Sequence, residues 1–387
     1  MNKTFQCAGP RAIVTNSSMG DRAVTLEWDD GTSSDFHYIW LRDNCACADC
    51  KHPDAWERTL DNVELDLDVR PRAVSFDDSL KITWEDGHQT SMTADWLRGH
   101  RYGRSGRDSR RESPILWTAG IATDPPSISL SEIDDDETGL QRWLTMVRDF
   151  GFTIVTDVPA RVGAVVELAE RIAHIQETHF GREFQVISKP DPENLAYTAV
   201  KLTAHTDVVN RRNLPGLQFL HCIEFEAEGG ESILIDGFEA ARRLREQHPK
   251  MHDLLATVEI PYMFVDEGHD VCNHQRIISV DSDGNHTEVR FHTALLGAID
   301  LDSEMIEPFY AAWQTFGRIL RDPDLEYVFK MEAGDCQVFD NRRVLHARSA
   351  FDPNTGHRHL QGTYVERDDF MSRLRVLERD GREFRIS

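Results

Sequence analysis

Residues 202–210, LTAHTDVVN, carry a histidine and an aspartate two positions apart, and residues 336–349, CQVFDNRRVLHARS, carry a further histidine. Alternate residues of a β-strand point to the same side, so a strand or strand end here would aim His205 and Asp207 at one point. Two imidazoles and one carboxylate occupy one face of a ferrous ion and leave the opposite positions open for substrates and O₂. We therefore predict that His205, Asp207 and His346 form a half-open iron site.

An arginine follows His346 by about a dozen residues. Arg358 begins the stretch RHLQGTYVE (358–366), and a guanidinium at this place can bind a carboxylate with two hydrogen bonds. Ferrous oxygenases that consume 2-oxoglutarate need such a group, because the far carboxylate of the keto acid must be neutralised in a dry barrel. A surface salt bridge is the alternative for Arg358, and Arg343 and Arg348 are competing candidates for the same role.

The composition describes a soluble protein with more than one folded core. The chain has 387 residues, 40% of them hydrophobic and 28% charged, and this length suggests two domains. The formal net charge of −24 repels phosphate backbones, so nucleic-acid binding is not expected. No stretch has the apolar length of a signal peptide or a membrane span, so we expect a cytoplasmic protein without a membrane partner.

The chain is predicted to have three parts. Residues 1–100 place β-forming stretches between Asp-Gly turns and predict a small β-rich domain. Residues 101–130 begin basic, with glycine and serine and no apolar period, and indicate a linker. Residues 131–387 combine helices, expected over 137–150 and 162–176, with many short strands. Short strands with a few outer helices are typical of a β-barrel or sandwich, so the expected fold class is α+β and mainly β.

Three of the seven cysteines lie together in LRDNCACADC (41–50). An odd number of cysteines, with three this close, does not describe a secreted disulfide framework. Together with His88, in TWEDGH (83–88), the thiolates of Cys45, Cys47 and Cys50 make the closed tetrahedral set of a structural zinc ion. Three unrelated reduced thiols and a nucleic-acid-binding finger are the alternatives, and the acidic charge argues against the finger. A zinc ion would stabilise a small domain with little core of its own.

Seven stretches, in unchanged order, resemble the γ-butyrobetaine dioxygenase family, which makes L-carnitine, and the related trimethyllysine dioxygenases. They are LRDNCACADC, TWEDGH, NLAYTAVKLTAHTD, LPGLQFLHC, EGGESILIDGF, FDNRRVLHAR and RHLQGTYVERDDFMSRLRVL. The resemblance covers roughly residues 22–377. It implies an N-terminal zinc-binding domain followed by a double-stranded β-helix (jelly roll) with flanking helices. It also implies hydroxylation of an unactivated C–H bond of a trimethylammonium substrate, first of all γ-butyrobetaine to L-carnitine.

The resemblance assigns roles to individual residues. It implies iron ligands (His205, Asp207, His346), zinc ligands (Cys45, Cys47, Cys50, His88) and two residues for 2-oxoglutarate (Arg358 and, by a weaker match, Ser232). A quaternary ammonium cannot donate a hydrogen bond, so aromatic faces must recognise it. The family's substrate pocket falls on Phe180, Phe184, Asn194, Tyr197, Thr293 and Tyr364, although Phe180 and Phe184, four residues apart, also suit an ordinary core. The implied partners and cofactors are Fe(II), 2-oxoglutarate, O₂, structural Zn(II), ascorbate as reductant and a second subunit in a homodimer.

Two departures from the family pattern concern the acidic end of the substrate. Thr293, with His292 and Arg290 nearby, stands where the family has an asparagine, and Val208 and Val209 stand where a proline follows the HTD motif. The anion is therefore left open between a carboxylate and a phosphonate. 2-(Trimethylamino)ethylphosphonate hydroxylase and trimethyllysine dioxygenase remain alternatives. Outside this class, a non-catalytic metal-binding interaction module and a zinc hydrolase that uses the same ligands also remain.

Overall fold

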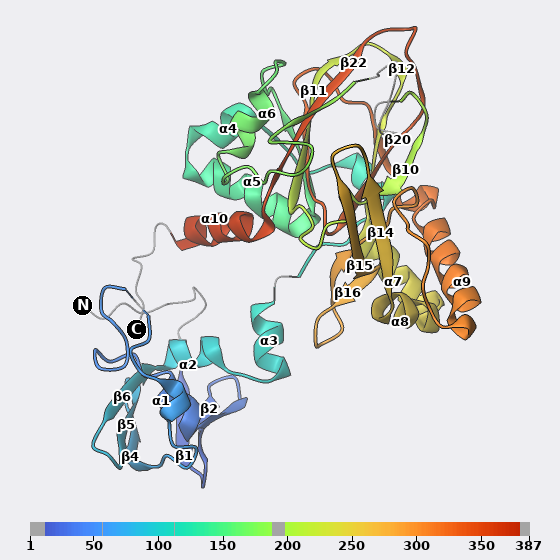
Figure 1. The fold of residues 1–387 in the computed structure, drawn as a ribbon. Coiled ribbons are helices and arrows are strands. Elements are labelled where there is room, and N and C mark those ends of the chain that lie inside the picture. The colour runs from blue at the N-terminus through green and yellow to red at the C-terminus, as the bar shows by residue number, and fades with distance from the viewer. Residues whose placement is uncertain (1–11, 56, 112, 188–197, 380–387) are drawn as a thin grey trace. The chain divides into compact units, whose positions relative to one another are not determined.

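A computed structural model describes residues 12–55, 57–111, 113–187 and 198–379 and divides the chain into two compact units (Figure 1). Unit 1 comprises Met1–Glu112 with Arg379–Ser387, and unit 2 comprises Ser113–Glu378. The division falls inside 101–130, the segment expected to be a linker. This segment is partly folded, because it contains α3 (Arg104–Arg110), η2 (Ala119–Thr123) and β7 (Ser127–Ser129), and β7 pairs with the first long strand of unit 2.

Unit 1 contains two antiparallel sheets of three strands each. One has β1 (Val14–Met19), β2 (Ala23–Trp28) and β3 (Ser33–His37), and the other has β4 (Pro71–Phe76), β5 (Ser79–Trp84) and β6 (Gln89–Thr93). A short helix follows each sheet: α1 (Tyr38–Asp43), with η1 (Asn62–Glu64) further on, and α2 (Ala94–His100). Alternating apolar residues bury Trp28 and Trp84 in one core between the sheets.

Unit 2 is a sandwich of two larger sheets. The four-stranded sheet has the order β10 (Leu202–His205), β20 (Val344–Arg348), β13 (Ser232–Asp236) and β18 (Tyr327–Phe329). The six-stranded sheet has the order β7, β8 (Phe152–Thr156), β19 (Cys336–Asp340), β11 (Leu217–Phe225), β22 (Arg358–Val365) and β9 (Phe184–Val186). The two-stranded pairs are β12 (Glu228–Gly229) with β21 (Phe351–Asp352), β14 (Glu259–Val265) with β15 (Asp270–Arg276), and β16 (Ile278–Val280) with β17 (His286–Val289).

Helices cover the outer face of each sheet (Figure 1). The six-stranded sheet packs against α4 (Leu130–Asp135), α5 (Glu137–Phe150), α6 (Ala164–Ala169) and α10 (Arg367–Arg379). The four-stranded sheet packs against α7 (Gly237–Gln247), α8 (Pro249–Thr257) and α9 (Ser303–Ile319), with η4 (Pro323–Leu325) after them. The predicted double-stranded β-helix with flanking helices is confirmed. No helix in the described ranges is both long and apolar enough to cross a bilayer.

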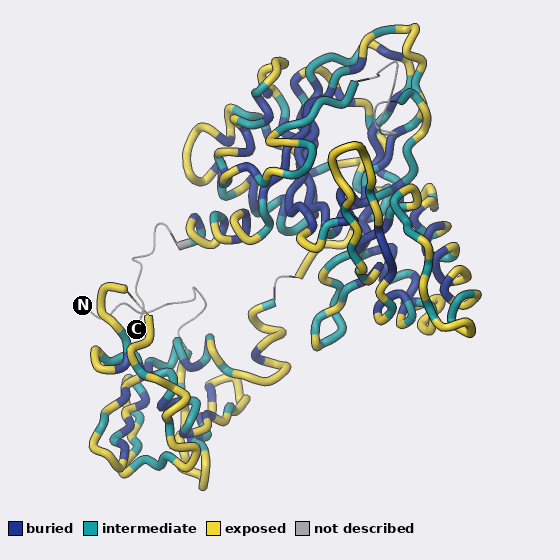
Figure 2. Tube along the Cα trace, in the orientation of Figure 1, coloured by how far each residue is buried: buried dark blue, intermediate teal, exposed yellow. Residues whose placement is uncertain are grey.

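Apolar side chains fill the space between the two sheets. Phe152, Leu220 and Phe339 from the six-stranded sheet meet Leu234 from the four-stranded sheet, and all four are almost fully buried. The buried stretches of unit 2 gather in the strands of its sheets (Figure 2). One end of this interior is polar, since Gln218 stands on β11, the strand of Leu220, and His346 stands on β20, next to β13. The sandwich therefore offers a rigid frame in which a few polar groups are held among packed apolar ones.

One predicted helix is shorter than expected. The sequence pattern favours a helix over 162–176, but α6 ends at Ala169. Further on, Ile175 forms a β-bridge with Val365, and the Gln176 N–H donates to the Tyr364 carbonyl at 2.9 Å. The chain leaves the helix because these residues extend along β22, a tertiary contact that the local pattern does not contain.

A buried ion pair ties the loop before β20 to the end of β13. Arg343 contacts Asp236 at 2.8 Å and also donates to the carbonyls of Asp149 and Ile115, while both charged side chains are at most 3% exposed. We expect Arg343→Met to destabilise unit 2 by about 3–5 kcal/mol, because Asp236 would remain as an uncompensated buried charge. Urea unfolding followed by tryptophan fluorescence would measure the loss.

The exposed pair Arg161–Glu167 is the matched control, with side chains 54% and 57% exposed. Arg161→Met should change stability by less than about 1 kcal/mol. Equal urea midpoints for the two variants would contradict the importance of the buried pair.

Candidate metal centre and substrate cavity

Three donor side chains meet where β10 and β20 lie side by side. The strand register places His205 opposite His346, and Asp207 follows just beyond the end of β10. Asp207 Oδ1 lies 3.3 Å from His205 Nε2 and 3.7 Å from His346 Nε2. Ligands at right angles about a metal ion, with bonds of about 2.1 Å, are about 3 Å apart, so this set fits one ion bound on one face. His205 Nδ1 contacts the Thr203 carbonyl at 2.9 Å, which leaves Nε2 for the metal.

The second oxygen of Asp207 is held by the opposite sheet. Gln218 Nε2 and the Tyr364 hydroxyl donate to Oδ2 at 2.7 and 2.9 Å, from neighbouring positions on β11 and β22. Burial raises the pKa of Asp207, but His346 and His205 beside it lower the pKa further, to a net value well below the ordinary one. Burial, with the charge of His205, lowers the pKa of His346 to about 3. An ionised carboxylate and a neutral His346 imidazole are the states that bind a cation.

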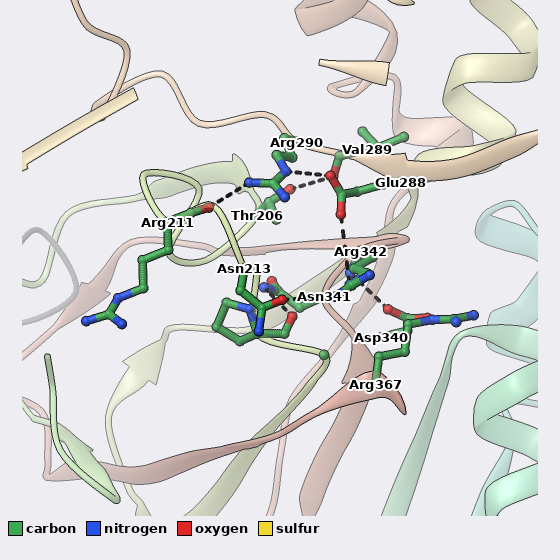
Figure 3. A network of polar contacts seen from close by, with 12 residues as sticks. Thr206, Arg211, Asn213, Glu288, Val289, Arg290, Asp340, Asn341, Arg342 and Arg367 are labelled. Atoms are coloured by element: carbon green, nitrogen blue, oxygen red, sulfur yellow. Dashed lines mark hydrogen bonds and ion pairs between the residues drawn. The ribbon is translucent and has the colours of Figure 1, made fainter. Parts of the chain in front are cut away.

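The loop after Asp207 is strained and tightly anchored. Val208 has φ +58°, a left-handed conformation that a β-branched residue rarely adopts and that costs about 1–3 kcal/mol. Asn341 binds the backbone of Asp207 on both sides of its Cα, because its Oδ1 accepts from Asp207 N at 2.9 Å and its Nδ2 donates to Asp207 O at 3.0 Å. Arg290 donates to the Arg211 carbonyl at 2.8 Å further along the loop (Figure 3). The surrounding network therefore fixes the position of Asp207.

A cavity of about 600 Å³ opens beside the metal donors. Its lining includes four of the predicted substrate residues: Phe180, Phe184, Thr293 and Tyr364. Asn194 and Tyr197 lie outside the described residues. Other residues also line the cavity and were not predicted from the sequence, among them His179, Lys201 and Phe264.

The cavity has an aromatic wall of four adjacent rings. Ring centroids are 6.0 Å apart for Phe264 and Phe180, 6.2 Å for Phe180 and Phe184, and 5.2 Å for Phe184 and Tyr364. Phe264 belongs to β14, about 80 residues from the other phenylalanines, so no spacing rule links it to them. The wall ends at Tyr364, whose hydroxyl contacts Asp207. Such a wall suits the apolar, positively charged face of a quaternary ammonium.

Arg358 is a buried cation with no carboxylate partner among the described residues. It is the first residue of β22 and is 8% exposed, and its guanidinium lies over the rings of Phe225 and Phe351 at 5.1 and 5.7 Å. Within the described ranges its Nε has no hydrogen-bond partner. Burial lowers the pKa of Arg358 to about 10, so the group stays charged at neutral pH. Because a buried unpaired charge is costly, the site fits a ligand carboxylate.

The two competing arginines have other partners. Arg343 pairs with Asp236, and Arg348 donates to the carbonyls of Thr198 and Val200. Ser232 is 3% exposed and begins β13, two residues after Gly230. A Cβ added at Gly230 would lie 3.2 Å from Arg358 Nε. The segment just before β13 therefore lies beside Arg358.

The four predicted zinc ligands of unit 1 also come together. His88 Nε2 lies 3.3 Å from Cys45 Sγ and 3.6 Å from the sulfurs of Cys47 and Cys50. Bonds of about 2.3 Å to sulfur and 2.0–2.1 Å to nitrogen put tetrahedral ligands about 3.6 Å apart, so the donors fit a zinc ion. The sequence did not indicate Arg42, which is 8% exposed and donates to Cys50 Sγ at 3.2 Å.

Two family models match the chain. Residues 115–364 match the model described as "Taurine catabolism dioxygenase TauD, TfdA family", and residues 15–100 match "Gamma-butyrobetaine hydroxylase-like, N-terminal". The chain belongs to the TauD/TfdA dioxygenase family. Its members are Fe(II)- and 2-oxoglutarate-dependent dioxygenases, so this chain is an enzyme of that kind.

The resemblance to γ-butyrobetaine and trimethyllysine dioxygenases is confirmed by full-length relatives in the TauD/TfdA family. A γ-butyrobetaine dioxygenase of Pseudomonas sp. (strain AK-1) is 37% identical and covers 97% of this chain and 98% of the relative. The γ-butyrobetaine dioxygenase of Homo sapiens is 32% identical over 92% of this chain and 95% of its own. A trimethyllysine dioxygenase of Meyerozyma guilliermondii is 31% identical over 94% and 96%.

Removal of the hydrogen bond from Gln218 should weaken metal binding. Without the Nε2 donor, Asp207 can turn both oxygens away from the imidazoles, so we expect Gln218→Leu to lower Mn(II) affinity about 10- to 100-fold. Titration of the metal-free protein, followed by electron paramagnetic resonance of free Mn(II), measures the change. Gln337→Leu, a buried glutamine on the neighbouring strand β19, is the control and should leave the affinity unchanged. Equal affinities in both variants would show that Gln218 does not orient Asp207.

Proposed function

We propose that this enzyme hydroxylates an unactivated C–H bond of a trimethylammonium substrate, with γ-butyrobetaine giving L-carnitine as the preferred reaction. The observation that carries this proposal is the position of the aromatic wall. The wall ends at Tyr364, whose hydroxyl donates a hydrogen bond to Asp207, one of the three metal donors. A substrate cation against these rings would place its neighbouring carbons next to the three metal donors. The names of the 37% and 32% identical relatives support the choice of substrate.

His205, Asp207 and His346 would hold Fe(II), and Arg358 would bind the far carboxylate of 2-oxoglutarate, with Ser232 nearby. Bound iron supplies O₂ activation, in which 2-oxoglutarate becomes succinate and CO₂ and the substrate gains one oxygen atom. The protein needs no acid or base for this reaction. Its residues orient one C–H bond, exclude water and keep the donors on one side of the ion.

The acidic end of the substrate would face the polar part of the cavity. Thr293 offers a hydroxyl there, and Lys201 offers an ammonium group. Lys201, Thr203 and His205 all line the cavity. A carboxylate and a phosphonate both suit these groups, so 2-(trimethylamino)ethylphosphonate is the first alternative and trimethyllysine the second.

A panel of quaternary amines tests the function. With Fe(II), 2-oxoglutarate and O₂, γ-butyrobetaine should give the highest rate of succinate and hydroxylated product by mass spectrometry, and Asp207→Ala should lower this rate at least about 1000-fold because one iron ligand is lost. No product from any amine in air would favour a non-catalytic binding module. Product formation without O₂ would favour a hydrolase, and preference for the phosphonate would replace γ-butyrobetaine as substrate.

The role of Arg358 can be tested separately. Its replacement by methionine removes charge-assisted hydrogen bonds worth about 1.5–3 kcal/mol each, so the KM for 2-oxoglutarate should rise at least about 10-fold. The KM for γ-butyrobetaine should change little. Arg161→Met, at the exposed pair with Glu167, is the control. An unchanged KM for 2-oxoglutarate would assign the carboxylate site to another residue.

Further properties complete the proposal. We propose a structural Zn(II) on Cys45, Cys47, Cys50 and His88, ascorbate as reductant, a homodimer and a cytoplasmic location. The donor spacing in unit 1 supports the zinc ion. Metal analysis of the purified protein, ascorbate dependence of turnover and light scattering would measure the first three.

A further inference from the structure

Gly362 occupies a place where a glycine needs an explanation. It lies in the middle of β22, directly opposite Leu220 of β11 on one side and Phe184 of β9 on the other. Its φ is not positive, unlike that of several other glycines in the described ranges, so its backbone conformation is open to any residue. A glycine inside a strand weakens the strand and often marks a place where another group approaches closely.

The approaching group is the ring of Phe184. A Cβ at position 362 would lie 2.3 Å from Phe184 Cζ, 2.5 Å from Cε2 and 2.9 Å from Cε1, far below the 3.5–4 Å of normal carbon contacts. The ring therefore lies directly over the glycine. In this position its plane is 31° from that of Tyr364, and both rings line the cavity.

We propose that Gly362 is a positioning residue that sets the specificity for the trimethylammonium group, an inference that rests on the proposed function. A methyl group at position 362 would displace the Phe184 ring by about 1 Å or more, into the cavity. The colliding atoms are the far end of a side chain, so the sheet itself can stay intact. The four-ring wall would then lose its shape at its middle, between Phe180 and Tyr364.

Three variants test this role: Gly362→Ala, Phe184→Leu and the double variant. Gly362→Ala should raise the KM for the quaternary amine about 2- to 30-fold, the loss expected for one well-placed ring, and should form more succinate per hydroxylated product. Phe184→Leu should have a similar effect. The double variant should match Phe184→Leu alone, because the methyl group then has no ring to displace.

Other outcomes would overturn the inference. Additive losses in the double variant would mean that Gly362 acts independently of the Phe184 ring. If Gly362→Ala had the wild-type KM and the wild-type ratio of succinate to hydroxylated product, Gly362 would have no positioning role. Gly120→Ala, where a Cβ has only Thr118 Oγ1 at 3.7 Å, controls for the substitution itself. If Gly362→Ala does not fold, the double variant still should, since it lacks the collision.

Failure of the proposed function gives a different result. In that case the wild-type protein would hydroxylate no quaternary amine, and the kinetic comparison would not arise. Calorimetric binding of tetramethylammonium to the wild-type and variant proteins still reports on the wall. Weaker binding in Gly362→Ala than in Gly120→Ala would support the ring displacement, and equal binding would contradict it.

Discussion

The structure of unit 2 depends on the shared use of one carboxylate. Asp207 Oδ2 accepts hydrogen bonds from Gln218 and Tyr364 of the six-stranded sheet. Its Oδ1 faces His205 and His346 of the four-stranded sheet. Hydrogen bonds to a charged group contribute about 1.5–3 kcal/mol each, so this carboxylate also connects the two sheets at the polar end of the sandwich. Because Tyr364 serves both the carboxylate and the aromatic wall, the substrate wall and the metal donors share one rigid support.

The sequence predicted the parts whose signal is local. The H-x-D pair, the cysteine cluster and the helix 137–150 follow from spacing and apolar pattern, and the structure has them where they were expected. Gln218, Asn341 and Phe264 had no such signal, because each acts on residues that the fold, and no sequence spacing, brings close. Arg358 could not be separated from Arg343 and Arg348 before their burial and partners were known. The proposed metal and substrate roles themselves remain predictions.

The charges around the cysteine cluster of unit 1 would nearly balance with a divalent cation bound. Three thiolates around a divalent cation leave one negative charge, and the buried guanidinium of Arg42 beside Cys50 offsets it. Burial raises the pKa of Cys50 to about 11, so without a cation this thiol holds its proton at neutral pH. Binding of a cation by these thiols would therefore be coupled to the release of protons.

The guanidinium groups of Arg348 and Arg358 lie against the same phenyl ring, Phe351, at 4.9 and 5.7 Å, and Arg358 has no carboxylate partner in the part of the chain that the structure describes. Like charges held this close work against the folded chain, and any small dicarboxylate of suitable length relieves them. By mass action such an anion, once bound, would lower the fraction of molecules that open and meet a protease.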